Sequence, residues 1–108
     1  MKVNIYYSYD EVTGDDKVKA LEVPNEIIAM INSSYTKYQN FLISLENSED
    51  RVKNSNRIKE LLTEYKESKW KLEKFIFDTT GLISCNDDCT NGYYGVEDAE
   101  TEETILEY

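Results

Sequence analysis

NRIKELLTEYKESKWKLEKFIFDTTG, residues 56–81, is the stretch that decides the fold. Its apolar residues recur at spacings of three and four, which places them on one stripe of a helix. Lys and Glu fill the opposite face, and Gly81 follows the last periodic residue, where a left-handed C-cap favours glycine. The pattern predicts a helix near 56–80 whose stripe, widened by Trp70 and Phe77, contains Ile58, Leu61, Leu62, Tyr65, Leu72, Phe75 and Ile76.

A second helical pattern precedes this one. From residue 25 to about 46 the apolar positions again follow helical spacing, and Pro24 suits the first turn of a helix. The polar segment 47–55 is the expected connection, with Asn54 or Ser55 as the cap of the second helix. Two long helices joined by so short a link are expected to pack as an antiparallel αα-hairpin.

The regions flanking the helices have strand character. Residues 2–11 alternate between apolar and polar, 13–16 have turn composition, and 17–23 fit a return strand. After the helices, 82–84, 93–96 and 101–108 each favour a short strand. The predicted fold class is therefore α+β in a single domain of 108 residues. It comprises a β-hairpin (1–23), an αα-hairpin (24–81) and an acidic C-terminal segment (82–108) whose strands extend the hairpin into a small antiparallel sheet.

Charge is concentrated at the C-terminal end. The chain carries a net charge of −10, and residues 82–108 contain eight acids with no Lys or Arg. Such a localised excess favours a surface for a basic protein partner, and the lack of a basic cluster argues against direct binding to nucleic acid. No secretory signal or membrane-length apolar run is visible, so the expected location is the cytoplasm.

The residue types argue against catalysis and against a bound cofactor or metal. The chain has no His, which removes His-dependent triads and His-metal sites. Cys85 and Cys89 are too few for a zinc site, and two reduced thiols or a disulfide remain open for them. Asp87 to Gly92 resembles a calcium loop only superficially, because Cys89 falls at a ligand position. We expect a protein that is not an enzyme.

Tyrosines accompany the acidic residues. Tyr93 and Tyr94 are adjacent, so on a strand they point to opposite faces and at least one should be exposed. Tyrosine among acids is typical of a protein-binding surface, although a solvated tail has a similar composition. The predicted partner-binding residues are Asp87, Asp88, Tyr93, Tyr94, Glu97, Asp98, Glu100, Glu102, Glu103 and Glu107.

In size, acidity and tyrosine usage the chain resembles the phage-encoded inhibitors of host defence nucleases, the anti-CRISPR and anti-restriction proteins. The resemblance implies an inhibitor that mimics DNA and occupies the basic nucleic-acid groove of a nuclease or CRISPR effector. Two alternatives stay open, besides a remote third, a protein that binds a metal ion through carboxylates. One is an immunity protein of a nuclease toxin, which the paired tyrosines beside Glu97 and Asp98 resemble. The other is an αα-hairpin adaptor, in one version a homodimer, that acts through an exposed apolar helix face.

Overall fold

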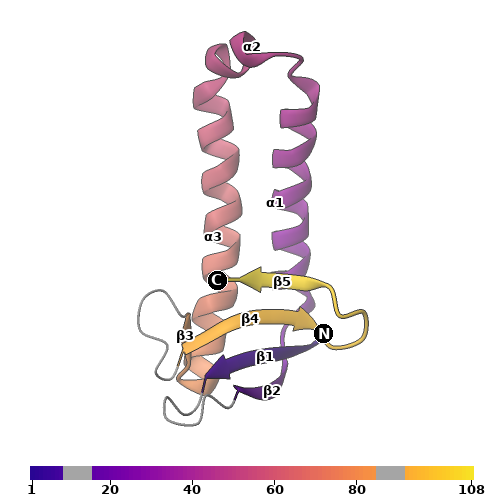
Figure 1. The fold of residues 1–108 in the computed structure, drawn as a ribbon, viewed down its shortest axis with the longest axis vertical. Helices are drawn as coiled ribbons and strands as arrows, with labels where there is room; N and C mark the ends of the chain where they lie inside the picture. The colour runs from indigo at the N-terminus through magenta and orange to yellow at the C-terminus, as the bar shows by residue number, and fades with distance from the viewer. Residues whose placement is uncertain (9–15, 85–91) are drawn as a thin grey trace. The chain divides into compact units, whose positions relative to one another are not determined.

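The protein has an α+β fold, as the sequence predicts. A computed structural model describes residues 1–8, 16–84 and 92–108 (Figure 1). The described chain divides into two compact units, Met1–Asn25 with Glu73–Tyr108, and Glu26–Leu72. In chain order the elements are β1 (Lys2–Ser8), β2 (Asp16–Glu22), α1 (Asn25–Ser44), α2 (Ser48–Lys53), α3 (Ser55–Thr80), β3 (Ile83–Ser84), β4 (Gly92–Asp98) and β5 (Thr104–Glu107).

The first unit is built on a small sheet in the order β2-β1-β4-β3, with β5 also paired to β4. The hairpin of β1 and β2 is the predicted one, and β4 joins it antiparallel to β1 (Figure 1). β5 pairs antiparallel with β4, as expected for the C-terminal strands. The sheet differs from the prediction at β3, whose two residues pair parallel to the start of β4.

The core of this unit lies on one face of the sheet. Val3 and Ile5 of β1 and Val96 of β4 are buried, and the register places Val96 between Ile5 and Leu106. Ile76, from the last turns of α3, is also fully buried and belongs to the same unit. The opposite face, which we call the outer face, therefore carries the intervening residues of these strands.

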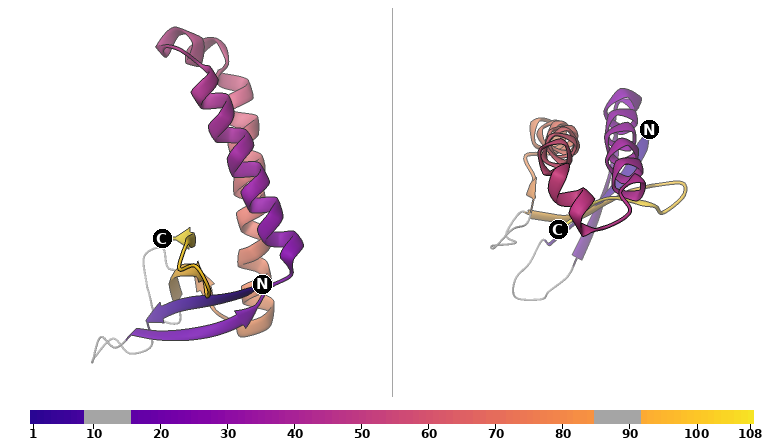
Figure 2. Two further views of the ribbon diagram at one scale, coloured as in Figure 1. Left: turned by 90° about the vertical axis from the view of Figure 1, so that its right-hand side faces the viewer. Right: turned by 90° about the horizontal axis from the view of Figure 1, so that it is seen from above.

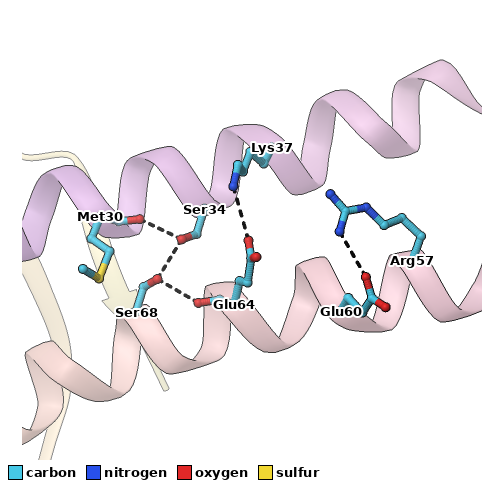
Figure 3. Close-up of polar contacts among 7 residues, drawn as sticks. All are labelled: Met30, Ser34, Lys37, Arg57, Glu60, Glu64 and Ser68. Carbon is cyan, nitrogen blue, oxygen red and sulfur yellow. Dashed lines mark hydrogen bonds and ion pairs between the residues drawn. The ribbon is translucent and has the colours of Figure 1, made fainter.

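The second unit is the predicted antiparallel αα-hairpin. α1 and the first part of α3 lie side by side and run in opposite directions (Figures 1 and 2). Ile31 and Leu61 are buried, as the helical stripes predict, and Tyr35 contacts Tyr65 with the ring centroids 5.3 Å apart. An ion pair joins Lys37 to Glu64 at 3.6 Å between exposed side chains (Figure 3).

A buried pair of serines also links the two helices. The Oγ atoms of Ser34 and Ser68 are 2.7 Å apart, and each Oγ lies 2.8 Å from a carbonyl of its own helix, Met30 or Glu64 (Figure 3). The short Oγ–Oγ distance requires that one hydroxyl donates to the other. Because each hydroxyl has a single proton, only the second hydroxyl can then donate to its own carbonyl. The hydrophobic pattern did not predict this contact, because it registers only apolar residues.

The connection between the long helices differs from the prediction. Within the predicted polar connection 47–55, residues 48–53 form the short helix α2, which the sequence analysis did not predict. The Asn47 side chain accepts a hydrogen bond from the backbone N–H of Asp50 at 2.9 Å, which caps this helix. The capping residue and the acids Glu49 and Asp50 in the first turn are sequence features typical of a helix start. The polar composition of the segment favoured a loop instead.

Two aromatic residues of the long helix are more exposed than predicted. Trp70 and Phe77 were expected to widen the buried stripe of α3, but they are 58% and 53% exposed. Successive helical residues are about 100° apart, so Trp70 is about 200° from Leu72 and Phe77 about 100° from Ile76. The stripe is narrower than the sequence predicted. Gly81, with φ 76°, occupies the left-handed conformation expected after the helix.

Candidate functional site

The predicted partner-binding residues fall mainly on one hairpin. Asp87 and Asp88, with the neighbouring Cys85 and Cys89, lie outside the described residues, so the predictions for them stay untested. The other eight belong to β4, β5 and the turn between them, residues 92–107, which we call the acidic hairpin. Glu97 and Asp98 are half-buried, whereas the remaining acids of the hairpin are exposed, namely Glu100, Glu102, Glu103 and Glu107.

Asp98 organises the turn of the acidic hairpin. Its Oδ1 accepts hydrogen bonds from the backbone N–H groups of Glu100 at 2.8 Å and Thr101 at 3.4 Å. Its own backbone N–H donates to the carbonyl of Glu103 at 2.9 Å, and Glu102 adopts a positive φ of 62°. This is the way an Asp side chain commonly fixes a turn. Asp98 therefore has a structural role, while the turn presents the exposed carboxylates of Glu100 and Glu103.

Tyr93 lies in the core, which contradicts its predicted place on a binding surface. Its side chain is fully buried, and its ring meets that of Tyr108 edge-on with the centroids 5.7 Å apart. The register shifts between β1 and β4, because Tyr6 pairs with Gly95 while Tyr7 pairs with Tyr93. Tyr94 is the extra residue of this β-bulge, and it points to the outer face as Tyr93 points inward.

Tyr6 contacts the acidic hairpin, although the sequence analysis did not predict a contact between them. Its hydroxyl donates a hydrogen bond to Glu97 Oε1, and its ring lies 6.3 Å from that of Tyr94. This hydrogen bond raises the pKa of Tyr6, because ionising the phenol would place a second negative charge beside the carboxylate. The contact joins residues 91 positions apart. Only the pairing of β1 with β4 creates it, and the sequence predicted that the strands share a sheet without predicting their register.

Stability at alkaline pH should report on the buried Tyr93. Burial raises the pKa of its hydroxyl above the usual value near 10, and the negative charge of Glu73 acts in the same direction. This contribution to stability is fully present below pH 10. The contribution is lost as pH rises further, because the tyrosine ionises in the unfolded chain at a lower pH than in the folded chain. For one group, the free energy of unfolding falls by at most about 1.4 kcal/mol per pH unit.

Tyr93→Phe should therefore flatten the loss of stability between about pH 10 and pH 11. Near pH 7 it should be close to neutral, because the Tyr93 hydroxyl makes no well-formed hydrogen bond among the described residues and has the Tyr108 side chain near it. Urea unfolding at pH 8, 10 and 11 measures both effects, with Tyr35→Phe, at a ring that is 47% exposed, as the matched control. An unchanged alkaline slope in Tyr93→Phe would contradict this assignment.

The described part of the chain offers no metal centre and no membrane span. No three His, Cys, Asp or Glu side chains in the described ranges are grouped so that they could hold a metal ion. In the same ranges, no helix combines the length and the apolar character that crossing a bilayer requires. Comparison of the chain with protein-family models, with curated proteins and with solved structures finds no match. The acidic hairpin and the outer face beside it form the candidate site.

Proposed function

We propose that this chain is a non-enzymatic inhibitor that presents the acidic hairpin to a basic groove of a nuclease or CRISPR effector. The observation that carries the proposal is an ordered, exposed set of carboxylates, held by a strand pair and a fixed turn. The chain has eight acids and no Lys or Arg in residues 82–108. The ion pairs among the described residues involve other carboxylates, so the exposed acids of the hairpin, Glu100, Glu102, Glu103 and Glu107, remain available to a partner.

The density of charge on the hairpin supports mimicry of a nucleic-acid backbone. Six acids lie between residues 97 and 107. As a single strand they would be spaced by about 6 Å, whereas the hairpin folds them back over a length of about 20 Å. That corresponds to about one charge per 3.4 Å, the spacing of phosphates along one strand of duplex DNA. The carboxylates of the hairpin are therefore spaced closely enough to bind a groove that otherwise binds the phosphates of one DNA strand.

Competition with nucleic acid tests this function. The full chain, immobilised, is exposed to lysate at about 0.05 M and 0.5 M salt, and the captured protein is then challenged with duplex DNA. We expect a nucleic-acid-binding protein that is released by the duplex and retained less at high salt. A partner whose binding ignores both salt and duplex would contradict the proposal. A partner that is the nuclease of a toxin would assign the inhibitor to the immunity class.

An adaptor function is the second candidate, and it rests on apolar side chains of the helical unit. Ile43 on α1 and Val52 on α2 are 78% and 73% exposed, more than the other exposed apolar side chains among the described residues. Such residues become favourable contacts when a partner covers them. If capture is insensitive to salt and is lost in the Ile43→Ser, Val52→Ser double variant, the helices are the interface and the acidic hairpin is not.

A further inference from the structure

The outer face of the sheet contains a hollow beside the acidic hairpin. It has a volume of about 200 Å³ and lies over β1, β4 and β5. Ligand pockets for drug-sized molecules usually measure 300–1,000 Å³, so this hollow suits one side chain better than a cofactor. Its lining includes Tyr6, Tyr94, Gly95, Glu97 and Glu107.

The hollow exists because the middle strand carries glycine at its centre. Tyr6 pairs with Gly95, and Gly95 pairs in turn with Glu107, so the three residues form one row across the outer face. A Cβ at Gly95 would meet only the Leu106 carbonyl, at 3.9 Å, and the backbone there is not left-handed. The fold therefore accepts a side chain at this position. The missing side chain leaves room between a tyrosine ring and a carboxylate.

The chemistry of the lining matches a planar cation. Tyrosine faces attract cations, and carboxylates bind the guanidinium group of arginine with paired hydrogen bonds. Tyr6 donates its hydroxyl to Glu97 Oε1, which fixes the carboxylate next to the aromatic ring and leaves its second oxygen for a ligand. Glu107, which is exposed, supplies a second carboxylate from the neighbouring strand. The hollow thus combines aromatic surface with negative charge on two sides.

We propose that this hollow receives an arginine side chain of the partner protein, stacked on the tyrosine rings and paired with Glu97 and Glu107. The assignment rests on the proposed function, since a groove that binds phosphates is lined by arginine and lysine. Arginine fits better than lysine, because its guanidinium group is planar, stacks on aromatic rings and binds carboxylates in a fork. The acidic hairpin then supplies long-range attraction, and the hollow supplies a specific anchor.

An NMR titration of the full chain tests the hollow without any knowledge of the partner. The probes are the N-acetyl amides of arginine, lysine and citrulline, the last being an uncharged analogue of arginine, at matched ionic strength. A single side chain is expected to bind with a dissociation constant in the roughly millimolar range. The arginine probe should shift the backbone amides of Tyr6 and of 94–97. The lysine probe should bind several-fold more weakly, and the citrulline probe should not shift these amides.

Substitutions localise the effect. Gly95→Val fills the hollow and should weaken the arginine probe about tenfold or more, the difference expected from losing a buried cation–aromatic and carboxylate contact. Glu97→Gln should weaken it similarly while leaving the ring of Tyr6 in place. Ala20→Val places the same valine side chain on exposed β2 and is the matched control, expected to bind as wild type. Unchanged unfolding midpoints for the variants establish that the fold is retained.

The outcomes separate the hollow from the proposed function. Three results would contradict arginine binding in the hollow. They are equal binding of the arginine and citrulline probes, an unchanged affinity in Gly95→Val, or no chemical-shift change at about 50 mM probe, well above the expected millimolar dissociation constant. The competition between duplex DNA and the captured partner could still succeed in that case, so the inhibitor function would stand. If Gly95→Val abolishes binding of the arginine probe but duplex DNA does not release the captured partner, the arginine site is supported and the inhibitor function is rejected.

Discussion

Leu72→Ala should lower the free energy of unfolding by about 2–5 kcal/mol, the range measured for truncating a buried leucine. Leu72 is 0% exposed and lies on α3 within the stripe predicted from the sequence. The loss combines the transfer of apolar atoms with the cavity that remains, because the surroundings collapse only partly. Urea unfolding at pH 7, followed by far-UV circular dichroism, measures the change in midpoint and slope.

Phe77→Ala is the matched control on the same helix. Its side chain is 53% exposed, so it gives up less buried surface, and we expect a change below about 1 kcal/mol. The pair of variants tests the narrow stripe directly. Equal losses in the two variants would mean that Phe77 contributes as the broader stripe predicted. A Leu72→Ala change within experimental error of zero would remove Leu72 from the core.

The helices could be predicted from the sequence because their signal is local and repeated. Most turns of α3 place another apolar residue on the stripe, and Gly81 marks the end. The width of the stripe was less predictable, since the seven-residue spacing of Trp70 and Phe77 placed both on its flank. The Ser34–Ser68 contact could not be predicted from the sequence, because no pattern distinguishes a buried serine and the two residues are 34 positions apart.

The sheet could be predicted in outline but not in register. Alternation in residues 2–11 predicted the first strand, and Val3 and Ile5, on one face of that pattern, are buried in β1. The bulge opposite Tyr6 and Tyr7 depends on how β4 aligns with β1, and no local signal specifies that alignment. This one irregularity decides the roles of the paired tyrosines, with Tyr93 buried and Tyr94 on the outer face.

The candidate site could likewise be predicted in part, because its composition is visible in the sequence and its contacts are not. The acids of the hairpin were identified by composition, because a run of one charge sign is visible in any window. The roles of individual acids were not, since Asp98 fixes the turn and Glu97 accepts from Tyr6 through contacts that only the fold creates. Gly95 was overlooked for a related reason. Its importance lies in the row from Tyr6 to Glu107, which spans three strands.

Reversing two charges at the tip of the acidic hairpin should slow association with a basic partner by about tenfold or more, within the range that electrostatic steering covers. The variant is Glu100→Lys with Glu103→Lys. Glu102 stays, because it occupies the left-handed position of the turn, and Glu107 stays because it lines the hollow. The net charge changes from −10 to −6, since each reversal adds two positive charges. Stopped-flow or surface binding kinetics with the captured partner measures the association rate constant.

The salt dependence and a control decide whether location matters rather than total charge. Glu46→Lys with Glu67→Lys makes the same change in net charge at two exposed positions outside the hairpin, and it should slow association much less. For wild type, the association rate should fall as salt rises from about 0.05 M to 0.5 M, because screening shortens the range of attraction to less than 10 Å. The tip variant should show a shallower dependence, while Gly95→Val should act on the dissociation rate, as desolvated anchors do. Equal slowing by both pairs of reversals would show that the partner responds to overall charge and that the acidic hairpin is not its contact surface.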